Sequence, residues 1–193
     1  MSAATVDDRA DGLGARIRAL RRSRSMTLAE LAERAGLSHP FLSQLERGLA
    51  RPSMASLERI VRALGASQLE LYAAMDDAAR FAGQPAVSLV REHEGVRAAY
   101  GLSDGRMLVH GARRFTPIEL RVTRRDRGEY FVHEEDEFVY VLSGSVVVDL
   151  GDREETVLHP GDALYFAGGI PHRWGLAGEG GECRMVTVKE ARR

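Results

Sequence analysis

The sequence has few of the features that mark secreted and membrane proteins. It contains one cysteine, Cys183, so an intrachain disulfide and a metal–thiolate cluster are both excluded. It has no apolar run of the roughly 20 residues that a membrane-spanning helix needs. Residues 1–12 are polar and acidic, whereas a secretory signal would be basic and then apolar. We therefore expect a cytoplasmic protein with no membrane partner, and we expect residues 1–12 to be disordered.

The net charge of −1 hides an uneven distribution along the chain. Between Gly12 and Gly65, ten arginines stand against four glutamates, which gives this segment a charge of +6 and leaves −7 for the rest. A basic segment joined to an acidic one is suited to bind phosphate groups at one end only. A solvated, arginine-rich helix surface would show the same charge pattern.

Residues 13–75 have the pattern of an all-helical domain. Apolar residues recur at helical spacing in the first segment, and Ser, Thr, Gly and Pro mark the ends of the later ones. Thr27 and Glu30 have the spacing of a capping box. Pro40 falls in the first turn of the third helix, where no intrahelical hydrogen bond is lost. The expected helices occupy residues 13–22, 27–36, 38–48, 53–65 and 69–75.

Residues 87–193 change to short β-branched or alternating stretches, separated by Gly, Asp and Pro. Ser143-Gly144 has the composition of a hairpin turn, and residues 149–153 supply another turn. Residues 76–86 are expected to be a linker. The fold class is therefore α+β in two domains, an all-α domain followed by an all-β sandwich or barrel. The clearest expected strands are 118–123, 138–142, 146–150 and 185–188.

The first domain resembles the xenobiotic-response-element (XRE) family of helix-turn-helix domains, which lambda-type repressors typify. The residues that carry the resemblance are TLAELA (27–32), GLS (36–38), LSQLERG (42–48) and RPS (51–53). The resemblance covers roughly residues 16–72 and implies that the third helix lies in the major groove of DNA. The same family usually acts as dimers on palindromic operators, so we expect a homodimer bound to double-stranded DNA.

The resemblance also implies which side chains meet DNA. Base edges are assigned to His39, Pro40 and Gln44, and the Gln amide can both donate to and accept from adenine. Phe41 would cover a thymine methyl group. Thr27, Ser38 and Ser53 are interpreted mainly as helix caps, although Thr27 also stands where phosphates are bound. The complete set of expected DNA-binding residues is Thr27, Ser38, His39, Pro40, Phe41, Ser43, Gln44, Arg47 and Arg51.

The second domain resembles the cupins, small β-barrels of double-stranded β-helix or jelly-roll type. The segment from Gly128 to Gly144 resembles the first cupin motif, and the segment from Pro160 to His172 resembles the second. The resemblance covers about residues 115–189. It departs from the family pattern where Phe131 replaces the usual first histidine, Ala167 replaces proline and Leu176 replaces asparagine.

His133, Glu137 and His172 form the candidate ligand site. Residues four apart on a strand share a face, so His133 and Glu137 should point the same way, and His172 can meet them across the barrel. Two imidazoles and one carboxylate are the donors of a facial triad with open coordination positions. Two alternatives stay open: one divalent iron, manganese, nickel or zinc ion, or a metal-free polar pocket.

Three functions are compatible with this organisation. The first is a transcriptional regulator whose DNA affinity changes when a small-molecule effector enters the barrel. The second is an enzyme, because the domain order and the triad also resemble a mononuclear non-haem iron epoxidase of phosphonate antibiotic synthesis. The third is a dimeric scaffold. The polar outer residues of the third helix and the inward polar residues of the barrel favour the regulator.

Overall fold

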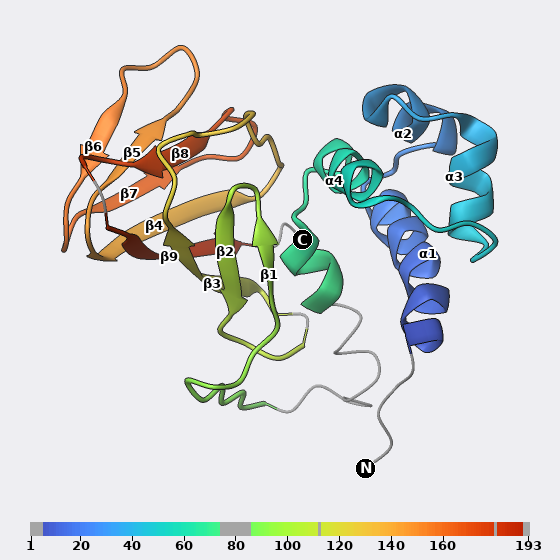
Figure 1. The fold of residues 1–193 in the computed structure, drawn as a ribbon, viewed down its shortest axis with the longest axis horizontal. Helices are drawn as coiled ribbons and strands as arrows, with labels where there is room; N and C mark the ends of the chain where they lie inside the picture. The colour runs from blue at the N-terminus through green and yellow to red at the C-terminus, as the bar shows by residue number, and fades with distance from the viewer. Residues whose placement is uncertain (1–5, 74–85, 112, 180, 191–193) are drawn as a thin grey trace.

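The computed structural model describes residues 6–73, 86–111, 113–179 and 181–190. A helical domain and a β-barrel lie side by side, and a short helix of residues 68–73 lies between them (Figure 1). The two-domain α+β fold class predicted from the sequence is confirmed. No helix in these described ranges is long and apolar enough to cross a membrane.

The helical domain is built as the cap residues predict. The Thr27–Glu30 capping box forms in full, and Ser38 and Ser53 cap the next two helices. Gly36 adopts the left-handed conformation that ends the second helix, with φ of 60°. The helices are α1 (Val6–Ser23), α2 (Leu28–Ala35), α3 (His39–Glu46) and α4 (Met54–Ala63).

Helix α1 begins at Val6, before the expected start at residue 13. The prediction used the first apolar residue of the periodic pattern, but a helix can continue beyond its packed part through its own backbone hydrogen bonds. Residues 6–12 are therefore helical and not disordered as expected, whereas residues 1–5 lie outside the described ranges. Inside α1, Gly14 allows α3 to approach closely, because a Cβ there would lie 1.9 Å from the Leu45 carbonyl oxygen.

The helix of residues 68–73 contributes to both hydrophobic cores. Leu69 packs within the barrel core, whereas Leu71, two residues later, packs within the helical core. Leu69 rests directly on the second strand of the barrel, since a Cβ at Gly105 would lie 2.6 Å from its Cδ2 atom. The two domains are thus joined by packing as well as by the chain.

The barrel consists of two antiparallel sheets. The larger has the strand order β1-β2-β3-β9-β4-β7, and the smaller has the order β6-β5-β8. Inward residues such as Val139 and Val141 on β4 alternate with exposed ones, as a half-buried strand requires. The strands are β1 (Arg97–Tyr100), β2 (Ser103–Met107), β3 (Phe115–Val122), β4 (Asp136–Ser143), β5 (Val146–Asp149), β6 (Thr156–Leu158), β7 (Ala163–Phe166), β8 (Arg173–Leu176) and β9 (Cys183–Glu190).

The expected hairpin at Ser143-Gly144 is wrong. A turn does form there, with φ of 71° at Gly144, but β4 pairs with β7 and β9 while β5 pairs with β6 and β8. The turn therefore carries the chain from one sheet to the other. The turn at residues 149–153 is confirmed, because β5 and β6 pair directly.

Candidate functional site

Helix α3 is fixed against α1 by a buried ion pair. Arg21 donates from Nε to Glu46 Oε1 at 2.6 Å and from a terminal nitrogen to Oε2 at 2.8 Å, and its other nitrogen donates to the Met26 carbonyl at 2.8 Å. Both residues are less than 10% exposed. Hydrogen bonding to Glu46 raises the pKa of Arg21 further. Leu42 and Leu45 complete the inner face of α3 as expected.

The outer face of α3 carries the residues expected to contact DNA. His39, Pro40, Gln44 and Arg47 are exposed, as are Thr27, Ser38 and Arg51 in the adjoining turns. Phe41 and Ser43 are half-buried, and Phe41 packs against the helical core. Seven of the nine residues are thus exposed, and contact with DNA stays a prediction.

Part of the basic segment faces the barrel instead of solvent. Arg24 donates to Glu135 at 3.3 Å, and Arg62 forms an ion pair with Glu129. Arg21 is buried in its pair with Glu46. The positive charge available to phosphate groups is therefore smaller than the sequence count suggests.

The barrel brings the predicted triad together. His133, Glu137 and His172 each offer a ligand atom within 4.8 Å of the others, and all three are buried. His133 Nε2 lies 2.8 Å and His172 Nε2 lies 3.4 Å from the same Glu137 oxygen, Oε2. His133 lies just before β4, not on it. The side chains of His133 and Glu137 therefore meet because of the loop conformation and not because they alternate along one strand.

The hydrogen bonds of the two histidines fit a metal ion. His133 Nδ1 lies 3.0 Å from the Glu135 carbonyl oxygen, and His172 Nδ1 lies 3.0 Å from that of Ile170. A carbonyl can only accept, so each Nδ1 carries the proton, and in a neutral His172 ring Nε2 then presents its lone pair. His172 Nε2 is buried and has no hydrogen-bond partner in the part of the chain that the structure describes. A cation between both Nε2 atoms and Glu137 Oε2 would satisfy all three donors.

The protonation states agree with this arrangement. Burial lowers the pKa of His172 to about 4, so the ring is neutral at neutral pH. Burial alone would raise the pKa of Glu137, but the hydrogen bond with His133 and the positive charge of Lys189 lower it to about 2. Thr187 donates its hydroxyl to Glu137 Oε1 and so orients the carboxylate. The triad therefore offers a neutral His172 imidazole and an ionised Glu137 carboxylate, the forms in which these groups bind a metal ion.

An aromatic wall surrounds His172. Its ring lies 4.7 Å from Phe166, 5.6 Å from Trp174 and 6.2 Å from Phe131, measured between ring centroids. Phe131 also pairs its backbone with that of His172. The residue that replaces the usual first cupin histidine therefore makes an apolar contact instead of offering a ligand.

The triad lies close to the contact between the domains. A cleft of about 780 Å³ runs between α2, α4 and the loop before β4, and His133 is among its lining residues. Gly65, with φ of 60°, sits against this loop, where a Cβ would lie 2.8 Å from the Val132 carbonyl oxygen. A molecule that reaches His133 from this cleft would touch both domains.

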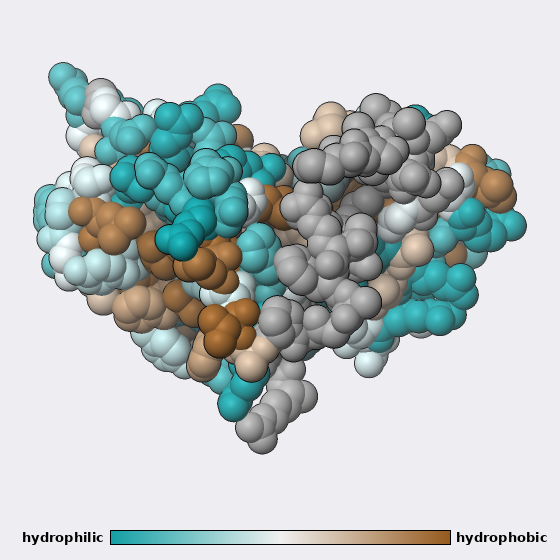
Figure 2. All heavy atoms as spheres, turned by 90° about the horizontal axis from the view of Figure 1, so that it is seen from below, coloured by the Kyte–Doolittle hydropathy of each residue, from teal (hydrophilic) through white to brown (hydrophobic). Residues whose placement is uncertain are grey.

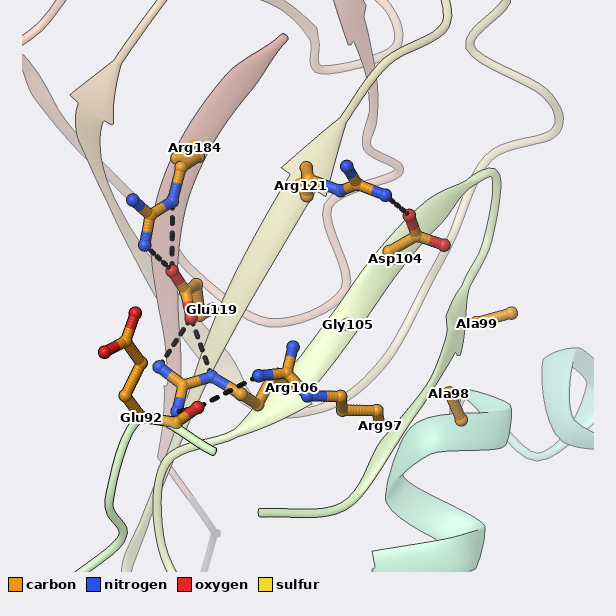
Figure 3. Close-up of a pocket in the computed structure, with 10 residues that line it drawn as sticks. All are labelled: Glu92, Arg97, Ala98, Ala99, Asp104, Gly105, Arg106, Glu119, Arg121 and Arg184. Atoms are coloured by element: carbon orange, nitrogen blue, oxygen red, sulfur yellow. Dashed lines mark hydrogen bonds and ion pairs between the residues drawn. The ribbon is translucent and has the colours of Figure 1, made fainter. Parts of the chain in front are cut away.

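A second cavity, of about 510 Å³, lies on the outer face of the larger sheet (Figure 3). Its charged groups bind one another: Glu119 accepts from Arg106 and Arg184, and Arg121 pairs with Asp104. Burial raises the pKa of Glu119, but the hydrogen bonds from Arg184 and Arg106 lower it overall. We interpret this cluster as a connection between β2, β3 and β9.

Three residues near the triad were missed by the sequence analysis: Thr187, Lys189 and Tyr100. Thr187 and Lys189 lie two residues apart on β9 and both point inward. The sequence signal that could have found them is a polar residue at an inward position of a strand. Tyr100, on β1, offered no such signal, because its position depends on how β1 packs in the barrel.

Fold and site together define a helix-turn-helix domain joined to a cupin barrel. Residues 12–74 match the helix-turn-helix domain family, and residues 121–189 match the cupin domain family. A Sinorhizobium fredii regulator, y4dJ, is 37% identical over 65 residues, which cover 34% of this chain and 84% of that protein. The chain therefore belongs to the HTH-type transcriptional regulators.

Two further similarities extend over both domains. The Escherichia coli regulator PuuR is 23% identical over 179 residues, covering 91% of this chain and 92% of PuuR. A crystal structure of an HTH_3 family transcriptional regulator from Vibrio cholerae has a TM-score of 0.60 at 20% identity, covering 98% and 100% of the two chains. By contrast, the chain spans 42% of the length of two Mycobacterium tuberculosis regulators with which it shares 46% identity.

Proposed function

We propose that this protein is a cytoplasmic, homodimeric transcriptional regulator whose affinity for an operator depends on a small molecule in the cupin barrel. The observation that carries the proposal is the packing of residues 68–73 into both cores. Leu69 lies in the barrel and Leu71 in the helical domain. A change in the barrel interior is thereby transmitted to the domain that presents α3.

The DNA-binding part of the proposal rests on the exposed face of α3. Gln44 and His39 are placed at the surface by a helix whose inner face is buried, so they can enter a major groove without rearrangement. Arg47 and Arg51 lie beside them and would bind phosphates. Gln44 reads a base, whereas the arginines contribute sequence-independent affinity.

The effector part rests on the triad. His133, Glu137 and His172 would hold one divalent metal ion of the iron, manganese, nickel or zinc type, and open coordination positions would accept a donor atom of the effector. The unpartnered Nε2 atom of His172 supports a metal over a metal-free pocket. When bound, the metal would supply a Lewis-acidic anchor for the ligand.

The experiment that tests the regulator combines DNA binding with metal analysis. Fragments from upstream of its own gene would be titrated with the protein, and fluorescence anisotropy would be measured for wild type, Gln44→Ala and Arg18→Ala, an exposed α1 control. Gln44→Ala should lose about 1–3 kcal/mol of specific binding and little non-specific binding. Equal specific affinity for all three proteins would contradict the assignment of α3.

Metal content would be measured on protein purified without chelators. Wild type should hold one divalent ion per chain, and His172→Ala should hold none. His159→Ala is the matched control, because His159 is exposed and its hydrogen bonds go to Ser145 and the turn at Asp162, away from the triad. Metal-free wild type would favour the alternative of a polar pocket.

The homodimer is supported by exposed apolar side chains on β4. Phe138, Tyr140 and Leu142 are 40–45% exposed on the outer face of the larger sheet, and Figure 2 shows apolar side chains gathered on the barrel part of one face of the molecule. Light scattering should give the mass of two chains, and Tyr140→Lys should reduce it to one. A monomeric wild type would contradict the homodimer.

The triad also favours a second candidate, a non-haem iron oxidase. Its three donors leave open the positions that substrate and oxygen would need. Oxygen consumption by the iron-loaded protein, measured with and without operator DNA, separates the two functions. A regulator binds DNA and consumes no oxygen above the His172→Ala background.

A further inference from the structure

The only lysine in the sequence lies inside the barrel. Of the 27 basic residues, 26 are arginines, and Lys189 is the exception. It is 3% exposed and stands opposite Glu137 in the pairing of β4 with β9. A buried ammonium group is costly unless it is paired, so its partners decide its purpose.

Lys189 is incompletely bonded. An ammonium group has three donors, and among the described residues only the Glu70 carboxylate lies within hydrogen-bond distance of Nζ, at 3.2 and 3.3 Å, while Glu137 acts on it through its charge. Charge-assisted bonds between nitrogen and carboxylate oxygen are usually about 2.7–2.9 Å long. The contact with Glu70 is therefore loose, and donor capacity remains.

Tyr100 stands beside Lys189. The Lys189 Nζ atom lies 5.0 Å from the centroid of the Tyr100 ring, and that ring stacks on Phe131 and Trp174, which also contact His172. The Tyr100 hydroxyl is buried and has no hydrogen-bond partner among the described residues. Burial, and after it the charges of Glu137 and Glu70, raises the pKa of Tyr100 well above its usual value, so the hydroxyl keeps its proton.

We propose that Lys189 and Tyr100 form a subsite for a carboxylate group of the effector, next to the triad. The subsite deepens the proposed function and rests on it. One ammonium and one phenol, both buried and both with donor capacity to spare, suit a carboxylate, which accepts several hydrogen bonds and carries one negative charge. The triad, through its metal or its imidazoles, would bind a second polar group of the same molecule.

The subsite is also connected to the DNA-binding domain. Glu70, which now contacts Lys189, belongs to the helix of residues 68–73 and accepts from the backbone and hydroxyl of Ser67. A ligand carboxylate that uses the remaining donors of Lys189 shares its single positive charge with Glu70. Ligand entry thereby weakens a contact that helps hold the two domains in their present arrangement.

The single lysine permits a direct test. Full-length protein labelled with ¹³C at lysine Cε gives one lysine signal, which Lys189→Met would assign by its loss. Metal-free protein would be titrated with sodium acetate and sodium formate, with acetamide and sodium chloride as neutral and anionic controls. A site for a ligand carboxylate must accept these small carboxylates, with dissociation constants on the order of 1 mM.

The expected result is a saturable shift of the Lys189 signal with acetate and formate and none with acetamide. Tyr100→Phe should weaken acetate binding about tenfold or more, since it removes one hydrogen bond to a charged group. Glu70→Gln should strengthen it, because the competing charge is gone. A wild-type signal that does not respond to either carboxylate, or that responds equally to chloride, overturns the subsite.

Operator binding by the same preparations separates this proposal from the regulator proposal. A carboxylate-dependent shift in protein that binds no operator would leave the subsite standing and overturn the regulator. Operator binding by protein whose Lys189 signal does not shift with carboxylate would overturn the subsite and leave the regulator standing. If both stand, acetate should change the operator affinity of wild type and leave that of Lys189→Met unchanged.

Discussion

Replacing Glu46 with glutamine should lower the stability of the helical domain far more than the same replacement at an exposed glutamate. The Glu46 carboxylate accepts two hydrogen bonds from Arg21, at 2.6 and 2.8 Å, and both side chains are almost completely buried. Glutamine preserves the shape but places an amide NH₂ group against a guanidinium that can only donate. Removing one partner of a buried pair costs about 3–5 kcal/mol.

Urea unfolding followed by circular dichroism would measure this loss. Glu33→Gln is the matched control, because Glu33 is exposed on α2 and should change stability by less than about 0.5 kcal/mol. The double variant Arg21→Met, Glu46→Leu should recover most of the stability, since an apolar pair of similar volume needs no desolvation compensation. A loss below about 1 kcal/mol for Glu46→Gln would refute the view that this pair holds α3.

In metal-free protein, acidification should destabilise the barrel. The pKa of His172 in the folded protein, about 4, lies below its ordinary 6.5, so the unfolded chain binds the proton first as the pH falls. The free energy of unfolding therefore decreases by about 3 kcal/mol between pH 6.5 and 4. Glu137, with a folded pKa of about 2, adds a further decrease between pH 4.5 and 2. His172→Gln should flatten the upper part of a plot of urea midpoint against pH, and an unchanged slope would contradict the assignment. Gly14→Ala should lower the melting temperature and the operator affinity together, because its Cβ meets the Leu45 carbonyl at 1.9 Å; an unchanged melting temperature would argue against that close approach. Burial raises the pKa of Cys183 to about 11, so a thiol reagent should modify it only as fast as the protein unfolds, and rapid labelling of native protein would contradict its burial.

The helical domain was predictable because its signals are local. The box formed by Thr27 and Glu30 and the stop at Gly36 depend on residues three or four positions apart. The earlier start of α1 concerns a segment without apolar periodicity. The ion pair of Arg21 with Glu46 could not be predicted, because a pairing across 25 positions has no local pattern.

The barrel was predictable in type and less so in pairing. The strands were recognised from alternation, but the turn at Gly144 was interpreted as a hairpin, since a two-residue turn between strands has the same composition whether or not those strands pair. The triad was found from the motifs and their spacing. Lys189 and Tyr100 were not, because only the folded barrel places β1 and β9 around the same interior.

The packing of Leu69 inside the barrel has a consequence for how this protein can be divided or recombined. A barrel fragment that begins at residue 87 would lack Leu69, leave the face of Gly105 uncovered and leave Lys189 buried without Glu70. A chimaera that combines this barrel with another DNA-binding domain should therefore be joined before Ser67, so that residues 67–73 stay with the barrel. The exchangeable unit ends with α4, several residues before the point where the first domain ends along the sequence.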